Sequence, residues 1–162
     1  MTTVDYLLFA LKLFAALGCG LIAGVFFAFS TFVMPSLARL QPARGIAAMQ
    51  SINITAINPL FMLALFGTAI ACLFIVIFAL LNWHRSGTIY LSIGSLLYLV
   101  GTILVTMLGN VPLNNALANV DPNSTEGKIL WAKYLIDWTF WNHIRTLTAL
   151  AASATFIISV TK

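Results

Sequence analysis

Residues 60–81 read LFMLALFGTAIACLFIVIFALL, an apolar run without a single charged side chain. A helix needs about 20 mostly apolar residues to cross the hydrocarbon core of a bilayer, and this run is long enough. It shows none of the alternation that a strand of a membrane barrel would require. Pro59 stands directly before it, where the first turn of a helix tolerates proline. The run therefore predicts a transmembrane helix.

Three further apolar runs have the length of a membrane span, at residues 6–34, 89–108 and 140–160. Only Lys12 interrupts the first run, which is too long and too poor in early cations for a signal peptide. Pro35 is expected to end or bend the first span, and Gly109 to close the third. The sequence therefore predicts an all-α, integral membrane four-helix bundle that residues 1–162 form as a single domain.

Two connections between these spans are longer than a turn. Residues 35–58 contain a stretch that is predicted to form an amphipathic helix at the membrane interface. Residues 110–139 are the longest polar stretch, and the helical spacing of apolar residues over 128–138 favours an ordered connection. Four spans bring both connections to the same end of the bundle, called here the loop face. The opposite end, with the two termini and the turn at residues 82–87, is the terminal face.

The composition excludes several classes of protein. Hydrophobic residues make up 61% of the chain and charged residues 7%, whereas a soluble domain averages about 25% charged residues. The net charge of +4 comes from Lys and Arg that stand singly or in pairs near the ends of apolar runs, which is typical of membrane flanks and excludes a nucleic-acid partner. The expected partner is the lipid bilayer of a cell membrane. The loop face holds more of these cations, which favours a cytoplasmic loop face.

The segment WTFWNHIRT at residues 138–146 carries most of the chemically versatile side chains. Helical spacing makes neighbours of four of them, namely Trp138, Trp141, Asn142 and Arg145. A polar group at membrane depth is costly, so this cluster, with His143 beside it, is a candidate site. The alternative is an interfacial belt in which tryptophans anchor the helix and Arg145 reaches lipid phosphate. The expected partner of Arg145 is Asp137 or an oxygen atom of a ligand.

Asparagines form a second group of candidates at the loop face: Asn53, Asn58, Asn110 and Asn114. Their amides are suited to line a pocket and bind an oxygen-rich ligand. In the alternative interpretation they satisfy backbone groups that Gly109 and Pro112 free from helical hydrogen bonds. For Asn58, which precedes Pro59, capping of the second span is somewhat favoured.

Metal and cofactor sites are not expected. The two histidines, His84 and His143, fall on opposite faces of the bundle and cannot share one metal ion or haem. Cys19 and Cys72 lie within apolar runs without a histidine beside them. No glycine-rich phosphate loop is present.

Two glycines, Gly20 and Gly24, are spaced so that another helix can approach the first span closely. Packing inside the bundle is the favoured interpretation. The alternative is a homo-oligomer that forms through this face.

Four ordered blocks of sequence resemble the anthrone oxygenase-like family of small four-helix membrane proteins. The blocks are GVFFAFSTFVMP at residues 24–35, AMQSIN with the later Asn58-Pro59 at 48–59, GNVPLN at 109–114 and WTFWNHIRT at 138–146. The resemblance implies oxidation of a lipophilic aromatic or quinone-like molecule by O2 without a cofactor. It also suggests His143 as a base, Arg145, Asn142 and Asn110 as groups that hold an enolate oxygen, and Trp138 and Trp141 as stacking surfaces.

Three functions remain open at this point. The first is a cofactor-independent oxygenase or oxidoreductase of this kind. The second is a non-enzymatic membrane binding or accessory protein, and the third, which has the least support, is a transporter. The spans contain no acidic residue at mid-depth, which argues against an ion path. A ligand-sized cavity at the loop face would favour the first function.

Overall fold

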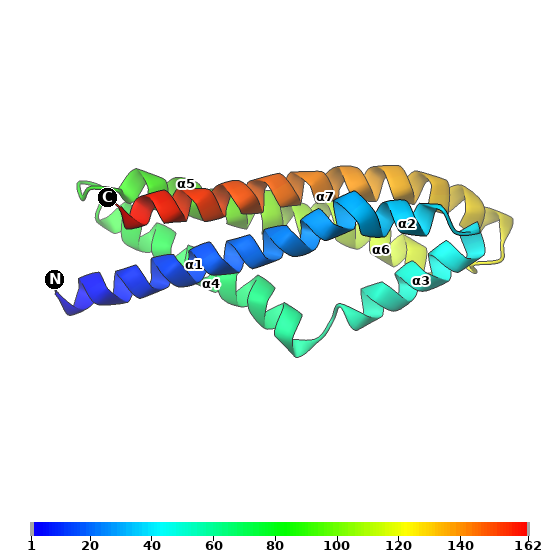
Figure 1. Cartoon of the computed structure of the whole chain (residues 1–162), viewed down its shortest axis with the longest axis horizontal. Coiled ribbons are helices and arrows are strands. Elements are labelled where there is room, and N and C mark those ends of the chain that lie inside the picture. The colour runs from blue at the N-terminus through cyan, green and yellow to red at the C-terminus, as the bar shows by residue number, and fades with distance from the viewer. Residues whose placement is uncertain (1, 162) are drawn as a thin grey trace.

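The computed structural model describes residues 2–161, which are helical with short connections and contain no strand. Four long helical segments pack lengthwise into a bundle (Figure 1). The two ends of the chain and the 82–87 turn lie at one end of the bundle. The short helices of the loop face and the start of α7 lie at the other (Figure 1). The predicted all-α, four-helix architecture is confirmed.

The first span runs through Thr3–Ala38 without interruption. It consists of α1 (Thr3–Ala28), a π-helical turn η1 (Phe29–Val33) and α2 (Met34–Ala38). The prediction that the span ends at residue 34 was wrong, because the helix continues past Pro35. Proline lacks the N–H that an α-helix requires and collides with the preceding turn. The wider π turn directly before Pro35 accommodates both effects.

The third span shows the same arrangement. It runs through Thr88–Ala118 as α5 (Thr88–Tyr98), η2 (Leu99–Leu104), η3 (Thr106–Asn110) and α6 (Val111–Ala118). The prediction that Gly109 closes this span was wrong, because the helix continues to Ala118. The π turn η3 ends at Asn110, just before Pro112, and again allows the helix to continue past a proline.

The helix that contains the fourth predicted span begins before it. Helix α7 covers Thr125–Val160, which includes residues 140–160, and the connection between the helices shrinks from 110–139 to 119–124. Ser124 caps the helix, because its Oγ accepts a hydrogen bond from Gly127 N at 2.8 Å. The helical spacing noted over residues 128–138 continues in phase with the apolar run that follows it, so one helix includes both.

The remaining helices are α3 (Pro42–Thr55) and α4 (Pro59–Leu81). Helix α4 is the predicted second span, and α3 is the predicted helical segment before it. The two meet at residues 54–60, called here the elbow, which protrudes from the bundle (Figure 1). Ile54, Ile57 and Leu60 on the elbow are 75%, 74% and 81% exposed. Side chains this apolar and this exposed are suited to contact with lipid rather than water.

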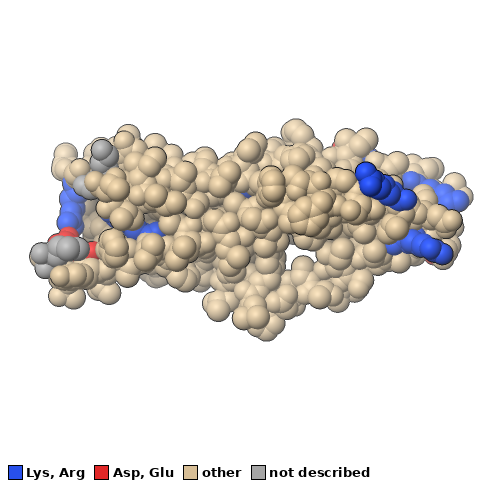
Figure 2. All heavy atoms as spheres, viewed as in Figure 1, with Lys and Arg blue, Asp and Glu red and all other residues tan. Residues whose placement is uncertain are grey.

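The surface matches a membrane protein as well. Figure 2 shows Lys and Arg toward the two ends of the molecule, with a largely uncharged region between them. Four helices are long and apolar enough to cross a bilayer. Large apolar side chains such as Leu17, Leu63 and Phe74 point outward from this middle region. The chain is therefore a membrane protein with its charges concentrated at the two faces.

The glycines of the first span have different environments. A Cβ atom at Gly20 would lie 3.3 Å from Ser153 Oγ of α7, whereas at Gly24 nothing lies within 4 Å. Gly20 therefore serves packing inside the bundle. Gly24 leaves an open position on the surface, and contact between copies through this face stays a prediction.

Candidate functional site

A cavity of about 910 Å³ lies between the elbow and the rest of the bundle. Figure 2 shows it as a hollow between the protruding elbow and the main body. Residues 49–58 of α3 and the elbow form one wall, and side chains of α1, η1, α4, η3, α6 and α7 form the others. Most of the lining is apolar, including Phe26, Phe29, Met49, Phe61, Met62, Leu65 and Phe66. The volume and the lining are typical of a site for a lipophilic small molecule.

Arg145 contributes the single charged side chain among the residues that line this cavity. It is only 5% exposed. Its Nη2 donates to Asn142 Oδ1 at 2.6 Å and its Nη1 donates to Thr106 Oγ1 at 3.2 Å. Its Nε is buried and has no hydrogen-bond partner. The guanidinium thus retains one donor that no protein group satisfies.

No carboxylate within residues 2–161 neutralises Arg145. The ion pairs in that range join Asp5 to Arg85 and Asp137 to Lys133. The expectation that Asp137 pairs with Arg145 was wrong, because the two are about 12 Å apart along one continuous helix. Of the two partners expected from the sequence, an oxygen atom of a ligand is the one that remains.

Aromatic rings partly compensate for the missing carboxylate. The guanidinium carbon of Arg145 lies 4.1 Å from the centre of the Phe26 ring and 5.3 Å from that of Trp138. Such cation–π contacts are worth about 2 kcal/mol or more when they are desolvated. They favour the charged form of the side chain without neutralising it. The arrangement therefore suits Arg145 to bind an anionic oxygen.

Asn142 positions Arg145 rather than lining the cavity. Its Nδ2 donates to Phe26 O and to Ser30 Oγ, both at 2.7 Å, so its Oδ1 is turned toward the guanidinium. Phe26 precedes η1 and Ser30 lies within it, while Thr106 begins η3. Both π turns therefore stand beside the same stretch of α7, which agrees with the frequent occurrence of such turns at functional sites.

A second polar group lies at the loop-face side of the cavity. Asn114 Oδ1 accepts hydrogen bonds from Tyr134 Oη and from Trp138 Nε1, each at 2.8 Å. Asn53 also lines the cavity, and its Nδ2 is buried without a partner. Two asparagines thus line the cavity in addition to Arg145, and the Nδ2 of Asn53 has no hydrogen-bond partner.

Asn58 has both of the roles considered for it. Its Oδ1 accepts from Phe61 N at 3.0 Å and caps α4, as the favoured interpretation had it. Its Nδ2 donates to Thr55 O at 3.0 Å, which ties the end of α3 to the start of α4. It also lines the cavity. Asn58 therefore shapes the elbow that encloses the cavity.

Four of the expected site residues do not line the cavity. Asn142 acts behind Arg145, and Asn110 is buried with its Nδ2 donating to Trp138 O at 3.1 Å. Trp141 packs on Gly109, where a Cβ atom would lie 2.7 Å from Trp141 Cγ. His143 is exposed on the outer side of α7. The structure thus brings together Arg145, Trp138 and three asparagines, namely Asn53, Asn58 and Asn114.

Sequence reasoning missed three residues that shape the environment of Arg145: Phe26, Ser30 and Thr106. A signal was present for one of them. Thr102, Thr106 and Asn110 repeat at intervals of four, which places them on one helical face. No comparable signal marks Phe26, since it is one of many phenylalanines in an apolar run.

The arrangement is suited to bind and stabilise a lipophilic anion. Fixed donors in an apolar site stabilise an oxyanion far better than water-exposed donors do. The cavity lining contains no His, Asp, Glu or Cys. Within residues 2–161, no group of three or more His, Cys, Asp or Glu side chains could hold a metal ion.

A model of a protein family described as anthrone oxygenase matches residues 59–155. The matched stretch extends from the start of α4 through most of α7 and includes Thr106, Asn114 and Arg145. The wall contributed by α1 and α3 lies outside it. Comparisons with curated proteins and with solved structures give no match.

Proposed function

This chain belongs to the anthrone oxygenase family, and from that premise we propose that it is a membrane oxidoreductase. It takes a lipophilic aromatic or quinone-like molecule into the cavity and oxidises it with O2 without a cofactor. The observation that carries the proposal is Arg145, a buried cation without a carboxylate partner on the wall of an apolar cavity.

The proposed reaction starts from a ring-fused aromatic ketone with a CH2 group that loses a proton readily. Loss of the proton leaves an enolate whose negative charge resides largely on the ketone oxygen. In this proposal the Arg145 guanidinium holds this oxygen, while Trp138 and Phe26 contact the rings. Loss of the proton makes the carbon electron-rich enough to react with O2, and stabilisation of the anion by Arg145 increases the fraction of the ligand that is deprotonated. Overall, one CH2 group becomes a carbonyl, one O2 is consumed and one water is released.

The proton is not assigned to a side chain of the cavity. His143 is exposed on the outer side of α7, and the lining offers no other imidazole or carboxylate. Water at the mouth of the cavity takes the proton in this proposal. The contribution of the chain is thus orientation and electrostatic stabilisation.

A binding protein for the same class of ligand is the second candidate. The observation that favours it is the absence of a titratable group other than Arg145 from the cavity lining. Such a protein would hold the lipophilic anion without oxidising it. The two candidates share the site and differ only in turnover.

The experiment is purification in detergent, identification of bound small molecules by mass spectrometry, and oxygen consumption with ring-fused hydroxyaryl ketones. We expect a ligand-dependent uptake of O2. Arg145→Gln should lower kcat/KM about 100-fold, the usual scale for loss of one oxyanion donor. Arg145→Lys, which keeps the charge but not the planar fork, should retain more activity.

Two outcomes would contradict the oxidase. If the wild-type protein binds such ketones but consumes no O2, the second candidate is correct. If Arg145→Gln binds and turns over the ligand as the wild type does, Arg145 is not the anion site and the proposal is wrong. Arg39→Gln, which removes a cation from the loop face outside the cavity, is the matched control.

A further inference from the structure

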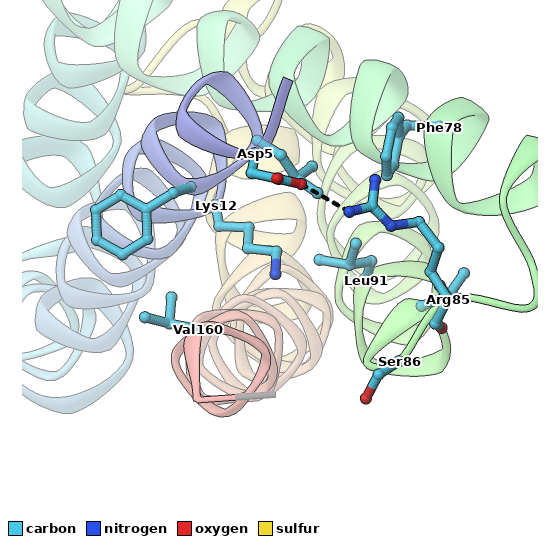
Figure 3. A pocket seen from close by; sticks show the side chains of 10 residues that line it. Asp5, Lys12, Phe78, Arg85, Ser86, Leu91 and Val160 are labelled. Carbon is cyan, nitrogen blue, oxygen red and sulfur yellow. Dashed lines mark hydrogen bonds and ion pairs between the residues drawn. The ribbon is translucent and has the colours of Figure 1, made fainter. Parts of the chain in front are cut away.

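A second cavity, of about 340 Å³, lies at the terminal face, at the opposite end of the bundle from the loop face. It is formed by the first turns of α1, the end of α4, the start of α5 and the end of α7 (Figure 3). Asp5, Lys12 and Arg85 give it three charged groups. Nothing in the proposed oxidation uses this site.

The carboxylate of Asp5 is fully engaged. Its Oδ1 accepts from Arg85 Nη2 at 2.7 Å, and its Oδ2 accepts from the backbone N and the hydroxyl of Thr2 at 2.8 and 2.9 Å. Asp5 therefore closes the N-terminal cap of α1 and orients Arg85 (Figure 3). The described hydrogen bonds of the Arg85 guanidinium use only Nη2, which leaves donors on its other nitrogens.

Lys12 has no carboxylate partner within residues 2–161. Its Nζ donates to Ser159 O at 3.0 Å, so the ammonium is turned inward among α1, α5 and α7 rather than outward (Figure 3). One carbonyl satisfies one of the three N–H donors of an ammonium group. Two cations and one carboxylate give the described lining of this cavity a net charge of +1.

The rest of the lining is largely apolar. Leu8 and Phe9 of α1, Leu91 of α5 and Val160 of α7 flank the charged groups. The cavity thus places free cationic donors next to a surface suited to alkyl chains. This combination matches an amphiphile with an anionic head group.

We propose that the terminal-face cavity binds the phosphate group of an anionic amphiphile, with the phosphate between Lys12 and Arg85. A phosphodiester carries one negative charge and offers several acceptor oxygens. It neutralises the net charge of the lining and satisfies the open donors of both cations. The apolar residues around the cavity hold the adjoining hydrocarbon. The site is independent of the oxidation proposed for the other cavity.

The test is native mass spectrometry of the full chain after reconstitution in vesicles of phosphatidylglycerol and phosphatidylcholine in equal amounts. Wild type should retain phosphatidylglycerol in preference to phosphatidylcholine. Lys12→Met, which keeps the apolar stem and removes the charge, should lower that preference about fivefold, the weight of one cation near anionic lipid. Lys12→Arg should restore it.

The matched control is Lys128→Met, which makes the same change at the exposed loop face and should leave the preference unaltered. A parallel titration with inorganic phosphate, read as a shift in Tm, distinguishes the source of the phosphate. A Tm shift that Lys12→Met abolishes indicates a free phosphate ligand. A lipid preference without such a shift indicates a head group.

Two results would overturn the proposal. One is a phosphatidylglycerol preference that Lys12→Met and Lys128→Met reduce equally, since any surface cation then suffices. The other is the absence of both lipid preference and phosphate-induced Tm shift in the wild type. Lys12→Arg keeps the positive charge. If it binds as the wild type does while Lys12→Met does not, the loss in Lys12→Met comes from the missing charge.

Discussion

At the scale of single residues, the decisive feature is the isolation of Arg145 from any carboxylate. A buried guanidinium without an acid is costly, and hydrogen bonds to Asn142 and Thr106 offset only part of that cost. Neutral hydrogen-bond acceptors leave the positive charge of Arg145 available to a ligand, whereas a carboxylate would neutralise it. The choice of asparagine rather than aspartate at position 142 is therefore functional in the proposed mechanism.

The first prediction follows from this choice. Asn142→Asp should lower the affinity for an anionic aromatic ligand at least about tenfold, because the new carboxylate pairs with Arg145 at the present 2.6 Å contact. Titration of the purified protein with a fluorescent hydroxyaryl ketone measures this change. Asn115→Asp adds the same charge to the cavity wall without a hydrogen bond to Arg145 and should have the smaller effect. Equal losses in both variants would contradict the special role of position 142.

The second prediction concerns His143. Since its side chain is exposed and lines no part of the cavity, His143→Ala should leave both oxygen uptake and Tm close to those of the wild type. Oxygen-electrode assays and thermal unfolding in detergent test this. A large loss of turnover at unchanged Tm would reinstate His143 as the base that the family resemblance suggested.

At the scale of elements, the π turns η1 and η3 explain how two proline-containing helices stay continuous. Each turn adds one residue to the local winding, which rotates everything beyond it relative to a regular helix. Ser30 within η1 and Thr106 at the start of η3 form hydrogen bonds with Asn142 and Arg145 of α7, respectively. The two proline-containing stretches, which resemble helix ends in the sequence, thus contribute Ser30 and Thr106 to the environment of Arg145.

The third prediction tests how closely η3 packs on α7. Gly109→Ala should destabilise the protein by about 1–3 kcal/mol, because its Cβ would lie 2.7 Å from Trp141 Cγ in a filled interface. Gly24→Ala is the matched control, since nothing lies within 4 Å and alanine favours the helix. Unfolding in detergent compares the two variants. Equal stability would show that the contact at Gly109 is loose.

At the scale of the whole molecule, the two faces differ in charge and in role. The loop face carries exposed Arg39, Arg44, Lys128 and Lys133, whereas Arg145 is buried and does not count toward surface charge. At the terminal face Lys12 is turned inward and Arg85 is paired with Asp5. The elbow and the large cavity belong to the half of the bundle at the loop face. The terminal-face cavity belongs to the opposite half.

The fourth prediction concerns orientation. Because Lys and Arg near span ends favour the cytoplasmic side, the loop face should be cytoplasmic and the C-terminus should lie on the opposite side. Two reporters fused to the C-terminus test this. A reporter that works only outside the cytoplasm should be active, and a reporter that works only in the cytoplasm should be inactive. The reverse result would mean that the terminal-face cavity faces the cytoplasmic leaflet.

Composition and apolar run length by themselves determined the membrane character, the four helices and the convergence of polar residues at the loop face. These features follow from the sequence because insertion of a helix into lipid depends on the length and apolar character of its own segment. It depends little on which other helices pack beside it. The cap at Asn58 was also predictable, since it depends only on residues next to it in the chain.

Only the tertiary structure decided which of the candidate residues face a cavity. The side-chain direction of Arg145, His143 and Trp141 depends on how α7 is rotated against α1 and η3, and residues more than a hundred positions away set that rotation. Helix continuity past Pro35 and Pro112 likewise depends on π turns that packing stabilises. Local sequence specifies a helix, but contacts between helices specify which of its faces becomes a site.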